Sequence, residues 1–371
     1  MTAASWEEDL SALSDGISEV LDAECDRRSV HAFFDGQNDL DRTLWARAAE
    51  LGWLGIGLPE EHGGLGLGAR GLDVLYRALG RALAPGAFLP TLAAAQWLSE
   101  AAPAGARDEL LAEVVAGART FAVPISLEAE PVALEGGALT GLSQPMLGSR
   151  SPDVAVAPVR IDGEAAFALV ALDGAAASFQ AADIWDRTRS TGRIVYDRAQ
   201  PLEVIRDPDG AVADSLRRCL ALGVAGDSVG GARAIATQTI DYLKERVQFG
   251  RPLAGFQALK HRAADLMTAV IQGEQALDQG VEMTAEGAPS ASMWASLAKA
   301  AACEHFHFVA DDCVQLHGGV GFTWEFDCHI FLKRALLNRE LAGDAGVQRD
   351  LAASFLAGAS LSGATTAELT T

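Results

Sequence analysis

An arginine and an aromatic residue stand together where a helical stretch ends, in the segment Arg246-Val-Gln-Phe249-Gly250. Arginine can bind a phosphate group through two parallel hydrogen bonds, and phenylalanine can stack on a heterocyclic ring. The segment could therefore hold a phosphorylated heterocyclic ligand. The alternative is a solvated helix end with Phe249 in the core, and the residues alone leave both interpretations open.

A second segment, Gln315-Leu-His-Gly318-Gly319-Val-Gly321-Phe, also ends a helical stretch. Glycine commonly terminates helices, so one interpretation is a helix C-cap followed by a tight turn. The other interpretation is that the missing side chains let backbone N–H groups approach a diphosphate or a ring. The segment by itself does not decide between them.

Taken in order, these segments resemble the C-terminal signature of acyl-CoA dehydrogenases. In that signature an Arg-x-x-Phe-Gly segment precedes a Phe-Gln pair and a later Gln-x-x-Gly-Gly-x-Gly-Phe segment with an acidic residue, which here is Glu325. Residues 58–66 resemble the family's N-terminal Pro-Glu-x-x-Gly-Gly-x-Gly loop. The resemblance implies an FAD cofactor that bridges two subunits. It assigns the diphosphate and adenine side of FAD to two sets of residues that come from different subunits: Arg246, Phe249 and Gln257 in one set, and Gln315, Gly318 and Gly319 in the other.

The resemblance also assigns a role to Glu325, which falls where many family members carry the catalytic base. Dehydrogenation of an acyl-CoA thioester needs a carboxylate that removes the α-proton while a hydride leaves the β-carbon for the flavin. Trp324 and Phe326 flank Glu325, and apolar neighbours would desolvate the carboxylate and make it a better base. The alternative is an acidic residue that favours the start of the next helix.

The flavin-ring side of the pattern departs from the family. Active members usually carry Thr-Glu-Pro…Gly-Ser-Asp and Trp-Ile-Thr segments in the middle of the chain, and residues 121–128 and 142–150 match neither well. After Glu325, Arg334 is followed by Ala-Leu-Leu-Asn, without the family's usual Tyr-Glu-Gly-Thr. The sequence therefore keeps the family's motifs for the adenine and diphosphate half of the FAD site, and it lacks the family's segments for the flavin-ring half.

This combination resembles the shorter subunits of actinobacterial heterotetrameric acyl-CoA dehydrogenases, which pair with a longer subunit that keeps the flavin contacts and the base. Residues 184–189 also resemble a segment frequent in such chains. The resemblance implies FAD-dependent α,β-dehydrogenation of an acyl-CoA, of a bulky steroid side-chain type, with electron-transfer flavoprotein as the electron acceptor. The partner would be the longer subunit, or a second copy of this chain in a self-sufficient homo-oligomer.

Two other functions fit the same pattern. The chain could be a non-catalytic structural subunit that completes the FAD site of a longer partner. It could also be another flavin enzyme on the same fold, such as a monooxygenase or a nitroalkane oxidase, whose pocket would react with O2.

The pattern of apolar and polar residues divides the chain into an N-terminal all-α domain, a β domain and a helical bundle. The predicted fold is therefore α+β and multidomain. Residues 1–118 predict the first domain, and a loop rich in Gly and Pro at residues 58–68 interrupts its helical periodicity. Residues 119–206 predict a β-barrel or sandwich of six to eight strands, because short apolar runs alternate with Gly, Pro and Asp.

Residues 207–359 predict a four-helix bundle, and residues 360–371 a frayed tail. Adjacent Gly230 and Gly231 in its first helix cost stability unless another helix packs closely there. Asp227 in the same helix could face an acyl pocket, or it could be an exposed or capping residue. The helices expected in this region cover residues 215–246, 257–283, 290–316 and 325–341.

The composition limits the possible partners. Acidic residues number 50 and basic ones 29, and the net charge of −21 argues against nucleic acids and anionic membrane surfaces. Neither a membrane span nor a signal peptide is indicated. Five scattered cysteines without a CxxC pair fit core thiols in a reducing cytoplasm. No metal site is expected, since His305 and His307 point to different faces of a helix.

Overall fold

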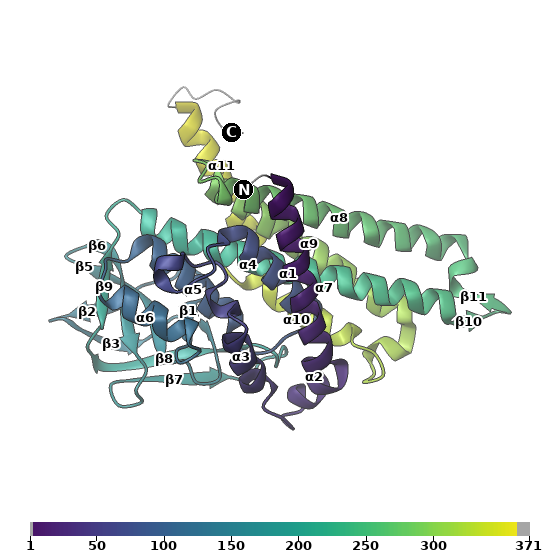
Figure 1. Cartoon of the computed structure of the whole chain (residues 1–371), viewed down its shortest axis with the longest axis horizontal. Helices are drawn as coiled ribbons and strands as arrows, with labels where there is room; N and C mark the ends of the chain where they lie inside the picture. Colours follow the sequence, from purple (N-terminus) through teal and green to yellow (C-terminus); the bar gives the residue numbers. More distant parts are fainter. Residues whose placement is uncertain (1–2, 362–371) are drawn as a thin grey trace.

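The computed structural model describes residues 3–361, which form three regions in chain order: helices, a β-sheet and a second set of helices (Figure 1). This order confirms the predicted α+β fold, with a helical N-terminal region, a β middle and a helical bundle. Helix α11 (Ala345–Leu361) reaches into the predicted tail. The rest of that tail, residues 362–371, lies outside the described residues.

The N-terminal region is helical, as predicted, apart from one glycine-rich loop. Its helices are α1 (Ala3–Glu24), α2 (Arg27–Phe34), α3 (Leu40–Glu50), α4 (Gly68–Arg81), α5 (Phe88–Ala101) and α6 (Ala106–Val115). Between α3 and α4 the chain forms two short 3-10 turns, Trp53–Gly55 and Glu60–His62, in place of regular helix. Gly64 is needed in this loop, because a Cβ atom would lie 2.0 Å from the carbonyl oxygen of Leu58.

The middle region is one nine-stranded sheet in which two pairs of short strands lie end to end. Its strands are β1 (Phe121–Pro124), β2 (Val132–Glu135), β3 (Ala138–Leu142), β4 (Met146–Gly148), β5 (Val154–Ile161), β6 (Glu164–Ala171), β7 (Ala177–Ala182), β8 (Ser190–Ala199) and β9 (Glu203–Arg206). β1 and β2 both pair with β5, and their partners β4 and β3 both pair with β8. The prediction of six to eight strands is wrong, because strands as short as β4 are recognisable only by their long-range pairing.

Both faces of strand β5 are buried, which explains its uninterrupted apolar sequence. On one face Val154 and Val156 join the core shared with the helices, where Trp97 of α5 meets Phe167 of β6 with ring centroids 5.4 Å apart. On the other face Ala155 joins a separate core within the sheet region. The sheet is therefore fixed to the N-terminal helices along one face and has a core of its own on the other.

The C-terminal region contains three long helices, as predicted. The helices are α7 (Ala211–Glu245), α8 (Gln257–Ala285), α9 (Ala291–His317) and α10 (Cys328–Glu340), followed by α11. A hairpin of β10 (Val247–Gln248) and β11 (Arg251–Pro252) links α7 to α8 and projects from the end of the bundle (Figure 1). Among the described helices, α7 is long and apolar enough to cross a membrane, but 89% of its apolar window is buried inside the fold, as in a core helix.

Two adjacent glycines let α7 pack closely against two other helices. A Cβ atom on Gly230 would lie 2.0 Å from the carbonyl oxygen of Arg77 in α4, and one on Gly231 would lie 2.6 Å from the ring of Phe306 in α9. The glycine pair therefore serves close packing on both sides of α7. Close packing of another helix is the condition under which two adjacent glycines were expected within a helix.

Gly230→Ala is expected to lower the free energy of unfolding by about 1–3 kcal/mol, because the added methyl group must push two helix backbones apart. The matched control is Gly273→Ala in α8, where the nearest atom would be 3.7 Å from the new Cβ. That control should be neutral or stabilising, because alanine favours helix over glycine by about 1 kcal/mol. Denaturant unfolding followed by circular dichroism measures both variants, and equal stabilities would contradict the close crossing.

Candidate functional site

The residues predicted to hold a cofactor gather at one end of the helical bundle. Arg246 directly follows α7, and Gln257 begins α8. Gln315 lies in the last turn of α9, just before the 3-10 turn Gly318–Phe322. Segments that are far apart in the sequence thus form one surface of a single chain.

Aromatic and ionic contacts hold this end of the bundle together. The ring of Tyr242, one turn before the end of α7, stacks on the ring of His317 at the end of α9, with centroids 4.3 Å apart and an interplanar angle of 17°. Arg262 of α8 forms an ion pair with Asp312 of α9. These contacts fix the three helix ends relative to one another before any ligand binds.

The side chains on this surface are exposed. Phe249 is 90% exposed at the tip of the hairpin, where its backbone has a left-handed φ of 53°. The alternative that Phe249 lies in the core is therefore wrong for this chain. Arg246, Gln257 and Gln315 are also exposed, and within residues 3–361 the guanidinium of Arg246 has no hydrogen-bond or ion-pair partner. It is free to bind an anion.

The glycine-rich turn contains one glycine that the fold requires and two that face open space. A Cβ atom on Gly321 would lie 2.7 Å from the carbonyl oxygen of Val314. A Cβ atom on Gly318 or Gly319 would meet no atom within 4 Å, although Gly318 has a left-handed φ of 65°. Packing within the described chain therefore does not explain Gly319. Its bare backbone fits the close approach of a bound group.

The electrostatics of this surface depend on Arg246. Helices α7 and α9 both present their C-terminal ends here, and the partial negative charge of a helix C-terminus disfavours an anion. The N-terminus of α8 and the unpaired guanidinium of Arg246 oppose this effect. Together with the exposed ring of Phe249, they form a surface that fits a diphosphate joined to a heterocycle.

Glu325 is exposed, and its aromatic neighbours turn away from it. The ring of Trp324 packs on His31 of α2 with centroids 5.3 Å apart, and Phe326 packs on Tyr242 at the same distance. The expectation that Trp324 and Phe326 would desolvate Glu325 is therefore wrong for this chain. Neighbours in the sequence do not cover the carboxylate, because each ring is directed into a different helix contact.

The carboxylate that does find partners in this segment is Asp327. Its Oδ1 accepts hydrogen bonds from Arg27 Nε at 2.9 Å and from His31 Nε2 at 2.5 Å, which ties the segment to α2. Helix α10 begins only at Cys328 and has no acidic residue in its first turn. The alternative role of Glu325 at the start of the last helix is therefore also wrong.

Comparison with known proteins matches most of the chain to one family. Residues 7–118 match the model of the acyl-CoA dehydrogenase N-terminal domain, and residues 220–357 match that of the acyl-CoA dehydrogenase C-terminal domain. The chain is 30% identical over 335 residues to acyl-CoA dehydrogenase IpdE2 of Mycobacterium tuberculosis, covering 88% of this chain and 91% of the relative. The chain belongs to the acyl-CoA dehydrogenase family. FAD-dependent dehydrogenation of acyl-CoA thioesters is the general reaction of this family, and FAD is its cofactor.

Solved structures of acyl-CoA dehydrogenases share the whole fold of this chain. The Tcur3481-Tcur3483 steroid ACAD superposes with a TM-score of 0.86 at 26% identity, covering 96% of this chain and 99% of that one. The ChsE4-ChsE5 complex from Mycobacterium tuberculosis superposes with a TM-score of 0.85 at 25% identity, covering 96% and 98%. The resemblance inferred from the sequence to the acyl-CoA dehydrogenase family of actinobacteria is confirmed.

In this acyl-CoA dehydrogenase, the two segments of the middle region that depart from the family's flavin-ring pattern lie side by side. Strand β1 pairs with β4, so that Val123 faces Leu147, and every residue of both strands is buried. The turn after α10 closes on the end of β1 through a hydrogen bond of 2.7 Å from Ala342 N to the carbonyl oxygen of Ile125. The position that the resemblance assigns to flavin contacts is therefore lined by the buried apolar strands β1 and β4.

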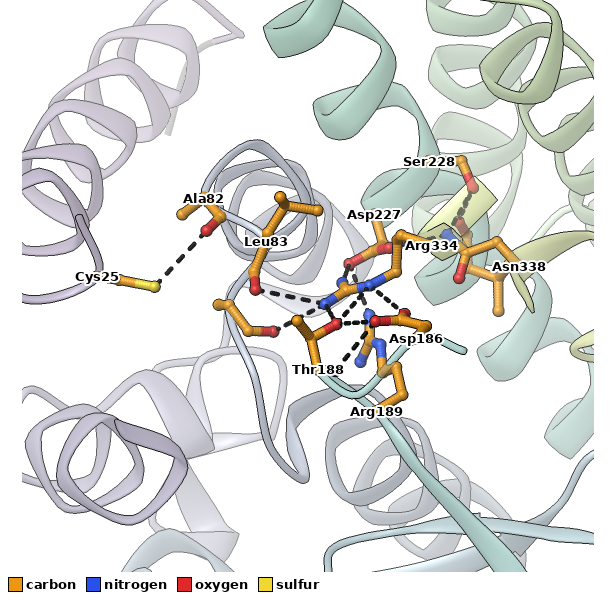
Figure 2. Close-up of polar contacts among 12 residues, drawn as sticks. Cys25, Ala82, Leu83, Asp186, Thr188, Arg189, Asp227, Ser228, Arg334 and Asn338 are labelled. Atoms are coloured by element: carbon orange, nitrogen blue, oxygen red, sulfur yellow. Dashed lines mark hydrogen bonds and ion pairs between the residues drawn. The ribbon is translucent and has the colours of Figure 1, made fainter. Parts of the chain in front are cut away.

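A buried cluster of charged residues joins the three regions of this acyl-CoA dehydrogenase (Figure 2). Arg334 of α10 lies at its centre, donating from Nε to Asp186 at 2.8 Å and from Nη1 to Asp227 at 2.8 Å. Arg189 Nη2 donates to the same oxygen of Asp227 at 2.6 Å, and Thr188 bonds to both Asp186 and Arg334. Arg334 Nη2 also donates to the carbonyl oxygens of Leu83 and Ala84, which follow the end of α4. Two arginines and two aspartates thus neutralise one another out of contact with water.

The position of Asp227 agrees with neither alternative that the sequence left open, a residue facing an acyl pocket or an exposed or capping residue. Asp227 is 1% exposed, it is not a helix cap, and it is paired within the charged cluster rather than directed at a substrate. Burial by itself would raise the pKa of Asp227, but Arg189, Arg334 and the amide of Asn338 outweigh burial and hold that pKa below its ordinary value. Sequence reasoning missed this cluster. The available signal was a lone charge in an apolar, glycine-rich stretch of helix.

Proposed function

We propose that this chain is one subunit of a heteromeric acyl-CoA dehydrogenase, in which it holds the adenine and diphosphate end of FAD for a longer partner subunit. The observation that carries the proposal is the contrast between two places in the same chain. At the end of the bundle, Arg246 and Phe249 are exposed, and the guanidinium of Arg246 has no hydrogen-bond or ion-pair partner among the described residues. The ring of Phe249 meets the ring of Phe256 edge-on, with centroids 6.2 Å apart. At the end of β1, the place expected to contact the flavin ring is lined by buried apolar strands.

The relatives support both the heteromer and the substrate class. ChsE4-ChsE5 is by its name a complex of two different chains, and Tcur3481-Tcur3483 is described as a steroid ACAD. This chain aligns with each of them over almost its whole length. We therefore propose a bulky acyl-CoA of steroid side-chain type as the substrate, electron-transfer flavoprotein as the electron acceptor, and the cytoplasm as the location.

The proposal divides the chemistry between two subunits. FAD, when bound, supplies the acceptor for the hydride that leaves the β-carbon of the acyl group. In this chain the guanidinium of Arg246 would pair with the diphosphate, the ring of Phe249 would cover a heterocycle, and the turn at Gly318 and Gly319 would admit the cofactor backbone. The longer subunit would supply the carboxylate that removes the α-proton, because the exposed Glu325 of this chain faces solvent beside α2.

The test is an absorbance spectrum of the purified chain, alone and after co-expression with a longer acyl-CoA dehydrogenase chain encoded beside it. Alone, the chain should lack stoichiometric flavin. Together, the two chains should co-purify as one complex that contains FAD and oxidises acyl-CoA. A lone chain that carries stoichiometric FAD and full dehydrogenase activity would overturn the heteromer.

Glu325→Gln in the complex is expected to change the turnover number by less than about twofold, whereas loss of a general base usually costs about 10²- to 10⁴-fold. Steady-state dehydrogenation of an acyl-CoA, normalised to bound FAD, measures the effect. The control is Glu61→Gln in the N-terminal loop, another exposed glutamate. A loss beyond about 100-fold in Glu325→Gln alone, at unchanged FAD content, would make Glu325 the base.

A further inference from the structure

The segment between β7 and β8 divides its side chains between the interior and the surface. Asp186, Thr188 and Arg189 are buried in the charged cluster (Figure 2). Trp185 and Arg187 alternate with the first two of these residues and are exposed. The charged cluster therefore explains the inward residues of the segment and leaves the two outward ones unexplained.

The indole of Trp185 is presented to solvent on a fixed backbone. It is 78% exposed, and within the described chain it has no hydrogen bond or ring contact. The next residue, Asp186, accepts hydrogen bonds from Arg334 Nε at 2.8 Å and from Thr188 N at 3.0 Å. A large aromatic side chain that is held in this way loses little conformational freedom on binding, which is typical of residues that anchor a protein interface.

A continuous face links Trp185 to the candidate cofactor surface. Burial and the charge of Arg187 lower the pKa of Lys333 in α10, which places this lysine beside the segment. Its Nζ atom lies 4.6 Å from the ring centroid of Phe34 in α2, and that ring lies 5.7 Å from the ring of Trp324. Trp324 is 49% exposed and stands two residues after the glycine-rich turn. A protein that covers the cofactor surface therefore reaches Trp185 along one face.

We infer that this face is the surface on which the longer partner subunit docks, with Trp185 as its anchor. The inference rests on the proposed function, in which FAD lies between the two chains. The indole would be buried against apolar groups of the longer chain, and Arg187 beside it would pair with a carboxylate.

The charges of the face favour a different chain over a second copy of this one. A second copy that docks symmetrically would bring the same cations, Arg187 and Lys333, towards each other across the two-fold axis. The net charge of −21 on each copy would add to the repulsion. A longer chain with acidic groups opposite these cations meets neither cost.

The experiment measures binding of the full chain to the longer acyl-CoA dehydrogenase chain encoded beside it, by biolayer interferometry in the presence of FAD. Trp185→Ser should weaken the complex about 30-fold or more, the usual effect of losing an interface tryptophan that carries much of the binding energy. Trp185→Phe should keep most of the affinity, since a ring still fills the position. The matched control is Leu202→Ser, a 50% exposed side chain beyond the opposite end of β8, which should change the affinity less than about twofold.

Arg187→Gln separates the contribution of charge from that of packing. The ion pair of Arg187 with Asp183 is exposed and 3.9 Å long, so its loss should leave the fold unchanged. Charges at the rim of an interface change chiefly the association rate, whereas buried aromatic side chains change the dissociation rate. Arg187→Gln should therefore slow association about two- to fivefold at low salt, with a smaller effect at high salt, and Trp185→Ser should speed dissociation.

The outcomes distinguish this inference from the proposed function. If Trp185→Ser binds the longer chain as tightly as wild type does, the heteromer stands and the docking face is refuted. If Trp185→Ser assembles normally but passes electrons to electron-transfer flavoprotein more slowly, the face belongs to the electron acceptor and the inference is overturned. If the wild-type chain does not bind the longer chain, the proposed function fails, and the inference with it.

Discussion

Arg334→Met is expected to lower the free energy of unfolding by about 3–5 kcal/mol, the usual cost of removing one partner from a buried ion pair. The reason is that Asp186 and Asp227, both at most 2% exposed, would then share only the cation of Arg189. Denaturant unfolding followed by circular dichroism measures the loss. The same variant should also be more susceptible to proteolysis, because the cluster joins all three regions of the chain.

Two comparisons test whether charge or packing is responsible. Arg334→Met combined with Asp186→Asn restores neutrality and should recover at least half of the lost stability, because no uncompensated charge stays buried. Arg206→Met removes an arginine from the exposed pair with Glu164 and should change stability by less than about 1 kcal/mol. A loss in Arg334→Met as small as that in Arg206→Met would contradict a buried, mutually dependent cluster.

The elements that the sequence predicts well are those whose residue pattern can be recognised within one short segment. Long helices have many turns of apolar periodicity, so the helix predicted at residues 257–283 differs from Gln257–Ala285 only at its end. The short strand β4, Met146–Gly148, has too few residues for a pattern and exists through its pairing with β1 and β8. Local signals therefore predict the order of the three regions, and the strand count depends on long-range pairing.

The same distinction holds for the candidate site. The grouping of the candidate cofactor residues at one end of the bundle could be predicted, because they lie in contiguous motifs at helix ends. Their role in binding FAD stays a prediction. The surroundings of Glu325 could not be predicted, since the direction of Trp324 and Phe326 depends on contacts with α2 and α7. The cluster around Arg334 draws on four separate elements, and no short segment of the sequence contains enough of it to be recognised.

Arg246→Gln is expected to reduce the affinity of the assembled complex for FAD about 100-fold, the largest functional effect predicted for this chain. Two charge-assisted hydrogen bonds to a phosphate contribute about 3 kcal/mol together, and glutamine cannot form the paired, charged contact. The side chain is exposed and has no partner within the described chain, so the fold should be unaffected. Equilibrium dialysis of the complex against free FAD measures the change.

The matched control for Arg246→Gln is Lys244→Gln. Lys244 carries the same charge two residues earlier, but it is paired with Asp241 at 2.8 Å along the side of α7. If the field of any nearby cation were sufficient, both variants would lose similar affinity, and the loss would shrink together with rising salt. If direct pairing with the diphosphate matters, only Arg246→Gln should release FAD, because Arg246 follows the end of α7 and has no partner in the described chain, whereas Lys244 is already paired. If the two variants bind FAD with equal affinity, direct pairing of Arg246 with the diphosphate is refuted.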